Sequence, residues 1–393
     1  MGRTRKRALK EECLVLKKLG PIEELELEPR DLTIIIGEQA TGKSLVAQML
    51  YFFRGLKDHL REAFKPGIRA FEKWPDVLVR GVLDDLRGVA FGYFANGTAT
   101  IKYERNEDES DWSLSIYSGN RMVNAGKMLR RKIEQWLMYL DSAEKIVFGQ
   151  KDSVKQVYIP TERSMYTRYA GNRPSVLFED FQPLPFRRFA DTLQGSLGKY
   201  AALRGKDSSL GRSPARALRG EAYVPRAGPK VWKWKTNDGG RGKILPIEAI
   251  ASGQMEAWPF FVVAEVMMAG NEPVDFYFEE PETHLHPKAQ VAVMDAVVRL
   301  VNAGHRMVVT THSPYILYRL NNLLQRHQLK QKRRSSALSL DPERLCAIRM
   351  GGRGAKNVLD RGGTDLIDAN ELERVADELG GEFDRLLDES ERK

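Results

Sequence analysis

The segment Gly37-Glu38-Gln39-Ala40-Thr41-Gly42-Lys43-Ser44 decides the fold, because it fits the phosphate-loop pattern G-x-x-x-x-G-K-[ST]. The β-branched apolar run 32–36 before it predicts a buried strand, and residues 45–53 after it predict a helix. In such a unit, the N–H groups of the loop and the positive end of the helix dipole converge on one anion. We therefore expect Lys43 to reach the β- and γ-phosphates of a nucleoside triphosphate and Ser44 to hold Mg²⁺.

A second half of this site is predicted far downstream. Residues 274–278 form a mostly apolar run that ends at Glu279 and Glu280. This is the form of a Walker B strand, whose first acid supports Mg²⁺ and whose second acid polarises the attacking water. The 236 positions between Lys43 and Glu279 are more than a compact nucleotide-binding core needs, so an insertion is expected between the two halves.

Two further motifs complete the series. Ser252-Gly253-Gln254 precedes a long apolar helix predicted over residues 255–268, in which Pro259 would be tolerated only near the start. Residues 307–311 predict another buried strand, and His312 follows it. A lone histidine at a strand end is usually a structural residue. The order of the motifs nevertheless favours a role for His312 at the nucleotide.

With these motifs, the chain resembles the ATP-binding-cassette (ABC) ATPases that are not transporters. These include RecF-like proteins, the heads of structural-maintenance-of-chromosomes (SMC) proteins, and above all the overcoming-lysogenisation-defect (OLD) family. The resemblance is carried by four segments: residues 250–256 (signature loop), 279–287 (Walker B and D-loop), 311–314 (switch histidine) and 158–164, a segment common among these ATPases.

The resemblance implies an α/β fold of the ABC type, with a mixed central sheet, helices on both faces and an inserted α+β region between Walker A and the signature motif. It also implies that two copies sandwich two ATP molecules. Ser252 and Gly253 of one copy would cap the γ-phosphate bound at Lys43 of the other, Glu280 would act as general base, and His312 would sense the γ-phosphate. The expected ligands are ATP and Mg²⁺. Mg²⁺ would be held by Ser44 and Glu279. ATP would be held by Gly37, Glu38, Gln39, Ala40, Thr41, Gly42, Lys43, Ser44, Ser252, Gly253 and Gln254.

Two positions depart from the usual family pattern. Glu279 stands where most ATP-binding cassettes carry Asp, and Ala251 alters the signature from Ser-Gly-Gly-Gln to Ala-Ser-Gly-Gln. Neither change removes a chemical role. The glutamine loop is not assigned by the sequence, because Gln150 and Gln156 both precede the Pro160–Arg163 segment.

Composition favours a soluble, cytoplasmic protein, and its positive net charge is biased toward anionic partners. Hydrophobic residues make up 42% of the 393 residues, which is ample for a core, and no apolar run approaches the length of a membrane span. Cys13 and Cys346 alone do not make a disulfide framework. The formal net charge is +9, with basic residues clustered in 3–7, 204–219 and 330–334. These clusters either contact nucleic-acid phosphates without sequence preference or form solvated surface.

The motif spacing divides the chain into six parts. They are an N-terminal half of the ATPase core (1–53), an inserted α+β region (54–145), a return to the core (146–169), a Pro/Gly/Arg-rich lid or partner-binding insertion (170–240), the C-terminal half of the core (241–320), and a basic linker with a C-terminal helical tail (321–393). In the insertion, residues 56–86 and 128–140 predict helices, and 89–94 and 98–103 predict hairpin strands. Residues 368–387 predict a charged pair of amphipathic helices.

Two metal-dependent readings are disfavoured. The toprim nuclease domain of OLD nucleases needs on the order of a hundred residues, whereas 81 residues follow His312, and Asp365-Leu366-Ile367-Asp368 has the wrong spacing for its Asp-x-Asp pair. The His-x-His of His284 and His286 lies inside the D-loop segment without a further ligand cluster.

Three functions follow as alternatives. The first is an ATPase sensor of a prokaryotic, antiphage defence system that works with a separate effector such as a nuclease. The second is a RecF-like ATP-dependent DNA-binding protein of DNA repair. The third, the ATPase subunit of a transporter, is disfavoured by the long insertion. No sustained heptad pattern indicates the long coiled-coil arm of an SMC protein.

Overall fold

The computed structural model describes the chain from residue 12 to residue 391. It leaves out residues 57, 60–94, 106–109, 118–122, 126–130, 132–153, 171–182, 204–207, 227, 238–241, 271, 334–336, 352–353 and 369. Gln150, the insertion helices predicted over 56–86 and 128–140, and the strand predicted over 89–94 therefore lie wholly or mostly outside the described residues.

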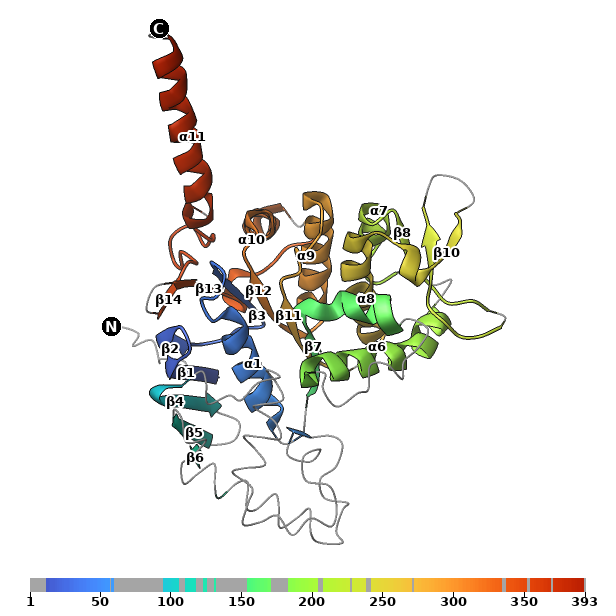
Figure 1. Cartoon of the computed structure of the whole chain (residues 1–393), viewed down its shortest axis with the longest axis horizontal. Helices are drawn as coiled ribbons and strands as arrows, with labels where there is room; N and C mark the ends of the chain where they lie inside the picture. Colours follow the sequence, from blue (N-terminus) through green and yellow to red (C-terminus); the bar gives the residue numbers. More distant parts are fainter. Residues whose placement is uncertain are drawn as a thin grey trace.

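A mixed six-stranded sheet forms the centre of the molecule (Figure 1). Its order is β14-β13-β3-β12-β11-β7, built from β3 (Leu32–Gly37), β7 (Lys155–Ile159), β11 (Val274–Glu279), β12 (Arg306–Thr311), β13 (Leu345–Gly351) and β14 (Gly354–Asn357). All neighbours are parallel except β13 and β14. The predicted α/β fold with a mixed sheet is confirmed.

Both faces of this sheet are covered, which explains why its strands are almost continuously apolar. One face packs against α1 (Lys43–Arg54) and a second, antiparallel sheet. The opposite face packs against α6 (Leu184–Leu203), α8 (Ser252–Met268), α9 (Pro287–Asn302) and α10 (Pro314–Arg333). Alternate residues of one strand face the two layers, as Ile34 and Ile35 of β3 show.

The antiparallel sheet has the order β2-β1-β4-β5-β6. It contains β1 (Glu12–Leu19), β2 (Ile22–Leu27), β4 (Ala95–Arg105), β5 (Ser110–Tyr117) and β6 (Val123–Ala125). The strand predicted over 98–103 is thus part of β4, which pairs with β1 as well as with β5. The inserted region is in this way attached to the N-terminal part of the core.

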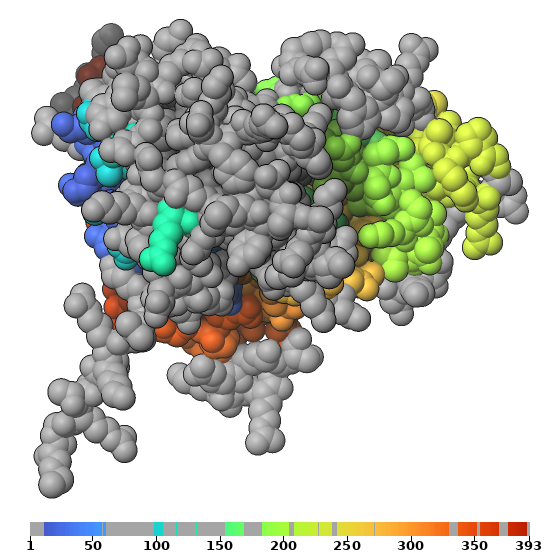
Figure 2. All heavy atoms as spheres, turned by 90° about the horizontal axis from the view of Figure 1, so that it is seen from below, coloured from blue at the N-terminus to red at the C-terminus, as the bar shows by residue number. Residues whose placement is uncertain are grey.

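Residues 183–250 occupy the opposite end of the molecule (Figure 2). After α6 come α7 (Ser213–Ala217) and a small sheet of β8 (Gly220–Tyr223), β9 (Lys233–Thr236) and β10 (Ile244–Pro246). Phe186, Phe189 and Leu193 of α6 are buried in the main core. Much of the described part of the Pro/Gly/Arg-rich stretch therefore packs as regular structure, and its role as a lid or partner-binding insertion stays a prediction.

Two further differences from the sequence-based predictions concern the second half of the chain. Pro259 lies in the middle of α8 and not near its start. Pro259 cannot donate to the carbonyl of Met255, but the buried surroundings of α8 maintain the helix. In addition, the sheet continues beyond residue 320 through β13 and β14, and the predicted pair of tail helices is the single helix α11 (Asn370–Glu391).

Candidate functional site

The predicted nucleotide-site residues converge on one edge of the central sheet. Strands β3, β12 and β11 are adjacent and parallel, so their carboxyl ends meet there. β3 ends in the phosphate loop, β11 ends at Glu279, and β12 is followed by His312. Ligands of open α/β sheets bind outside the carboxyl ends of the strands. The structure therefore brings together the three motifs that the sequence placed up to 275 positions apart.

The phosphate loop has the backbone conformation that its glycines permit. Gly37 and Gly42 have φ values of 147° and 93°, in the region that favours glycine, and Ala40 has φ of 60°. A Cβ on Gly42 would lie 2.8 Å from Cγ1 of Ile22, and one on Gly37 would lie 2.5 Å from the carbonyl oxygen of Met350. Gly42 is also the N-cap of α1, so the first N–H groups of this helix open toward the loop.

Lys43 lies over the phosphate loop. Its Nζ donates to the carbonyl oxygens of Gly37 and Glu38 at 2.9 and 2.7 Å. Burial lowers the pKa of Lys43, and the nearby charges of Glu280 and Glu282 oppose that shift. Lys43 therefore lies close enough to the acids after β11 for their charges to act on it.

The two Walker B acids have different surroundings. Glu279 is buried, and its Oε1 accepts from the hydroxyl of Tyr158 at 2.7 Å. Glu280 is a third exposed and has φ of 41°, which turns the chain away from the strand direction. Its N–H donates to the carbonyl oxygen of Thr310 at 3.0 Å, so the turn is tied to β12. The buried Glu279 is therefore placed to support a metal ion, and the more exposed Glu280 is placed to act as a base.

Glu282 is a site residue that the sequence analysis did not single out. Its Oε1 accepts from the backbone N–H of His312 at 2.7 Å and from the hydroxyl of Thr311 at 2.9 Å. The Nδ1 atom of His312 lies 3.4 Å from the same oxygen and 3.9 Å from Oε1 of Glu280. Glu282 therefore orients the histidine beside the candidate base. The third acid of Glu-Glu-Pro-Glu was the available signal for this role.

The residues predicted to hold Mg²⁺ fit that ion by their donor chemistry. Ser44 follows Lys43 in the first turn of α1 and offers a hydroxyl oxygen, and Glu279 offers a carboxylate at the same sheet edge. Mg²⁺ prefers such oxygen ligands together with waters and phosphates. We found no group of three or more metal-ligating side chains among the described residues. His286 of the His-x-His instead caps α9, with Nδ1 accepting from the N–H of Lys288.

The signature segment is presented at the start of α8. Ser252 is exposed, and Gln254 closes the turn by accepting from the N–H of Ala251 at 2.9 Å and donating to the carbonyl of Leu218 at 2.7 Å. A Cβ on Gly253 would lie 2.6 Å from the carbonyl oxygen of His284, so only glycine allows this contact with the D-loop. Gln254 thus has a structural role in the turn, and Ser252 is accessible to another molecule.

Gln156 does not lie at the nucleotide edge. In β7 it pairs with Asp275, four positions before Glu279, near the amino ends of the parallel strands. Of the two glutamines considered for the glutamine loop, Gln150 lies outside the described residues. Neither is placed at the phosphate site by the structure.

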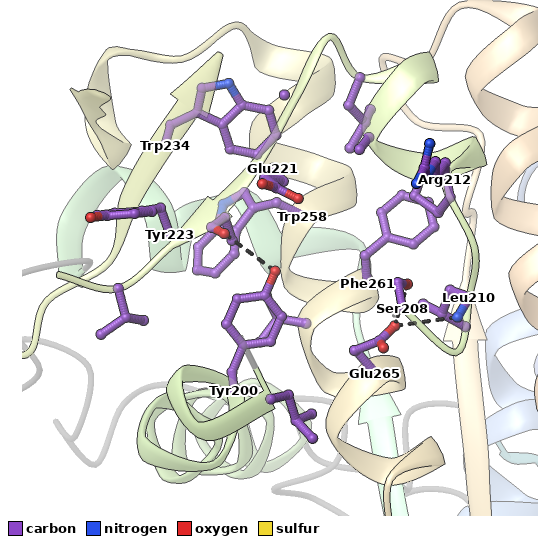
Figure 3. Close-up of a pocket in the computed structure, with 18 of the residues that line it drawn as sticks. Tyr200, Ser208, Leu210, Arg212, Glu221, Tyr223, Trp234, Trp258, Phe261 and Glu265 are labelled. Atoms are coloured by element: carbon purple, nitrogen blue, oxygen red, sulfur yellow. Dashed lines mark hydrogen bonds between the residues drawn. The ribbon is translucent and has the colours of Figure 1, made fainter. Parts of the chain in front are cut away.

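Behind the signature helix lies a cavity of about 310 Å³ (Figure 3). Tyr200, Tyr223, Trp234, Trp258 and Phe261 line it, with Glu221, Arg212 and Glu265 at its polar parts. Glu265 is already occupied, since it accepts from Ser208 and from the N–H groups of Ser209 and Leu210. Three arginines of the basic cluster in 204–219, namely Arg212, Arg216 and Arg219, are exposed and lie on or beside α7, and Arg212 lines the cavity.

Comparisons with known proteins agree with an ATPase. Residues 194–317 match the family model described as "AAA ATPase domain" (AAA_15). This segment is less than half of the chain, and it includes the second half of α6, the signature helix, Walker B and His312. No curated protein matches the chain.

Among solved structures, the similar ones include heads of SMC proteins. An SMC head bound to the C-terminal winged-helix domain of ScpA is 14% identical, with a TM-score of 0.46, covering 88% of this chain and 96% of the other. An SMC head with an extended coiled coil from Pyrococcus furiosus is 12% identical, with a TM-score of 0.46 and coverage of 93% and 98%. The SMC head domain from Thermotoga maritima is 11% identical, with a TM-score of 0.38 and coverage of 88% and 97%.

The described helices include none that is both long enough and apolar enough to cross a membrane.

Proposed function

We propose that this protein is an ABC-type ATPase that binds Mg²⁺–ATP, dimerises around it, and hydrolyses it to ADP and phosphate. The observation that carries the proposal is the convergence of Lys43, Glu280 and His312 at one sheet edge, with the charges of Glu280 and Glu282 acting on Lys43. Lys43 and the loop N–H groups would bind the phosphates, and Ser44 and Glu279 would hold Mg²⁺.

In the hydrolysis step, Glu280 would accept a proton from the attacking water as the bond between the water oxygen and the γ-phosphorus forms. The bond from that phosphorus to the β–γ bridging oxygen would break, leaving ADP and inorganic phosphate. His312, held by Glu282, would stand at the γ-phosphate. Bound Mg²⁺ would neutralise charge on the phosphate oxygens.

Dimerisation is supported by the exposed signature segment. Ser252 and Gly253 would cap the γ-phosphate held by the second copy, so that ATP forms part of the interface and hydrolysis releases it. A ligand that contacts only the closed dimer shifts the population toward that dimer. We further propose, on the resemblance to OLD-like ATPases, that this cycle regulates a separate effector protein, such as a nuclease of a defence system.

The test is the mass of the Glu280→Gln variant in solution with and without Mg²⁺–ATP. We expect a stable ATP-dependent dimer, because the variant keeps the phosphate contacts but lacks the base. The double variant Lys43→Ala/Glu280→Gln is the matched control and should not respond to ATP. An unchanged hydrolysis rate in Glu280→Gln would contradict the assignment of the base. Co-purification with the products of neighbouring genes would then identify an effector, whereas capture of DNA by the ATP-bound dimer would favour the repair function.

A further inference from the structure

Helix α11 presents an apolar stripe away from the rest of the protein. It projects from the body and ends at the C-terminal tip (Figure 1). Leu379, Phe383 and Leu386 are 60%, 60% and 56% exposed. Together with Ala376, their spacing alternates between three and four residues, which places them on one face of the helix. Large apolar side chains in this pattern on an otherwise charged helix are typical of a helix that packs against another helix.

The charge of α11 restricts what can cover that stripe. The helix has nine acidic and two basic residues, which give it a formal net charge of −7, whereas the whole chain carries +9. Glu382 and Glu389 precede Phe383 and Ser390 and flank the stripe along one side. Pairing of α11 with a second α11 would bring like charges together and is disfavoured. The surface that covers α11 is therefore expected to be basic.

Helix α10 offers such a surface. Its sequence has five basic residues and no acidic residue. Arg319 is paired with Asp295 of α9, whereas Arg326 is exposed. Its outer face exposes Tyr318 (39%) and Leu329 (45%), with Asn322 and Arg326 between them at spacings of four, four and three residues. The two helices have 20 and 22 residues, about 30 and 33 Å at 1.5 Å per residue. The two helices thus match in length and are opposite in charge, and Tyr318 and Leu329 offer exposed apolar side chains to the α11 stripe.

Within one chain, the segment just before α11 is held against α10. Asn321 and Ile367 exchange two hydrogen bonds of 2.8 and 2.9 Å, and Gln328 donates to the carbonyl of Thr364 at 2.8 Å. From this fixed base α11 runs away from the body (Figure 1). It therefore extends away from the outer face of its own α10, and a second copy can supply the same face.

We propose that α11 of each copy packs on the outer face of α10 in a second copy, forming a reciprocal, two-fold symmetric interface. This interface is separate from the ATP sandwich and needs no nucleotide. A two-fold symmetric dimer is favoured because the contact between α11 and α10 then forms twice, once in each direction. Used together with the ATP-dependent contact, it links ATP-bound dimers into a larger assembly.

The experiment is sedimentation velocity of the full chain without nucleotide, in the Lys43→Ala background so that the ATP-dependent contact is absent. We expect a concentration-dependent dimer. Phe383→Ser/Leu386→Ser should raise its dissociation constant at least about tenfold, because both side chains lose their apolar contact. Asp388→Asn, on the opposite face of α11, is the control and should change it by less than about threefold. Thermal unfolding of all variants checks that the body is intact.

A charge reversal identifies the surface on α10. Arg326→Glu should weaken the dimer, and adding Glu382→Arg and Glu389→Arg in the same chain should restore it. A chain that stays monomeric up to its solubility limit would overturn the proposal. So would a dimer that Phe383→Ser/Leu386→Ser abolishes but Arg326→Glu leaves unchanged, since α11 would then pair with another surface. These measurements use no nucleotide, so their outcome is independent of the test of the proposed ATPase function.

Discussion

Arg163 and Glu256 are joined twice in the interior of the protein. Nε of Arg163 donates to the carbonyl oxygen of Glu256 at 3.0 Å and lies 3.4 Å from its carboxylate. The same guanidinium donates to the carbonyl oxygens of Glu279 and Glu280, each at 2.9 Å. Because Glu256 lies in the second turn of α8, Arg163 connects the helix that begins at Ser252 to the turn that carries the candidate base.

This connection predicts a loss of turnover without a loss of nucleotide binding. In Arg163→Lys the buried charge remains, but a lysine cannot make the planar set of donations to four carbonyl groups. A shift of the Glu280 turn by about 1 Å would lower kcat by roughly 100-fold. Steady-state hydrolysis and direct ATP binding measure the two quantities separately. The exposed Arg168, replaced by Lys, is the control. Equal losses of binding and turnover would show that Arg163 supports the fold alone.

Gly42 predicts a loss that is specific to nucleotide binding. Gly42→Ala meets Ile22 and alters the N-cap of α1, so ATP binding should weaken by at least about tenfold. Gly304 has a similar φ of 96°, but a Cβ there would meet nothing within 4 Å. Gly304→Ala therefore carries the same backbone strain, about 1–2 kcal/mol, without touching the site. If both variants bind ATP equally, the contact at Gly42 is not needed for binding.

A buried ion network joins the antiparallel sheet to the core and predicts a pH dependence. Arg54 donates to both oxygens of Glu12 at 2.7 and 2.8 Å, and Tyr103 donates to one of them at 2.9 Å. Burial raises the pKa of Glu12, but the charge and hydrogen bonds of Arg54 outweigh it, with help from Arg306 and Tyr103. The pKa therefore lies below its ordinary value of 4.5. This stabilisation is present above the unfolded pKa and is lost as the pH falls through the folded pKa.

Glu12→Gln should accordingly lower the free energy of unfolding by about 3–5 kcal/mol at neutral pH, because the buried Arg54 loses the carboxylate to which it donates. Denaturant titrations at neutral pH and at acidic pH below 4.5 should show that the difference shrinks on acidification. The unfolded state takes up the Glu12 proton first, and the folded state follows as the pH falls through its lower pKa. Glu24 and Lys17 form an exposed pair, and Glu24→Gln should change stability by no more than about 0.5 kcal/mol. A difference that stays constant with pH would contradict the assigned role of the Glu12 carboxylate.

The sequence predicted those parts of the site that lie next to recognisable short patterns, namely the glycine loop and the residues after apolar strands. The phosphate loop needs its glycines, and Glu279, Glu280 and His312 each follow an apolar strand, so their meeting at one edge follows from parallel pairing. The role of Arg163 could not be predicted from the sequence. Its partners at Glu256, Glu279 and Glu280 lie 93 to 117 positions away and are backbone carbonyls, which every residue has, so no residue type identifies them. β13 was missed for a similar reason. Its place beside β3 depends on a non-local pairing after the last recognisable motif.

Helix α11 predicts one further result, in its own stability. Gly380 and Gly381 lie in the middle of the helix, and a Cβ on either would meet nothing within 4 Å. Each glycine costs a helix about 0.5–1 kcal/mol relative to alanine, so Gly380→Ala/Gly381→Ala should stabilise α11 by about 1–2 kcal/mol. Hydrogen exchange should show slower amide exchange in residues 376–390, with the central sheet unchanged. If α11 packs on a second copy, the same variant should also tighten the nucleotide-free dimer, because less ordering accompanies association. Slower exchange without tighter association would contradict this coupling, because a better ordered α11 would then bring no gain in association.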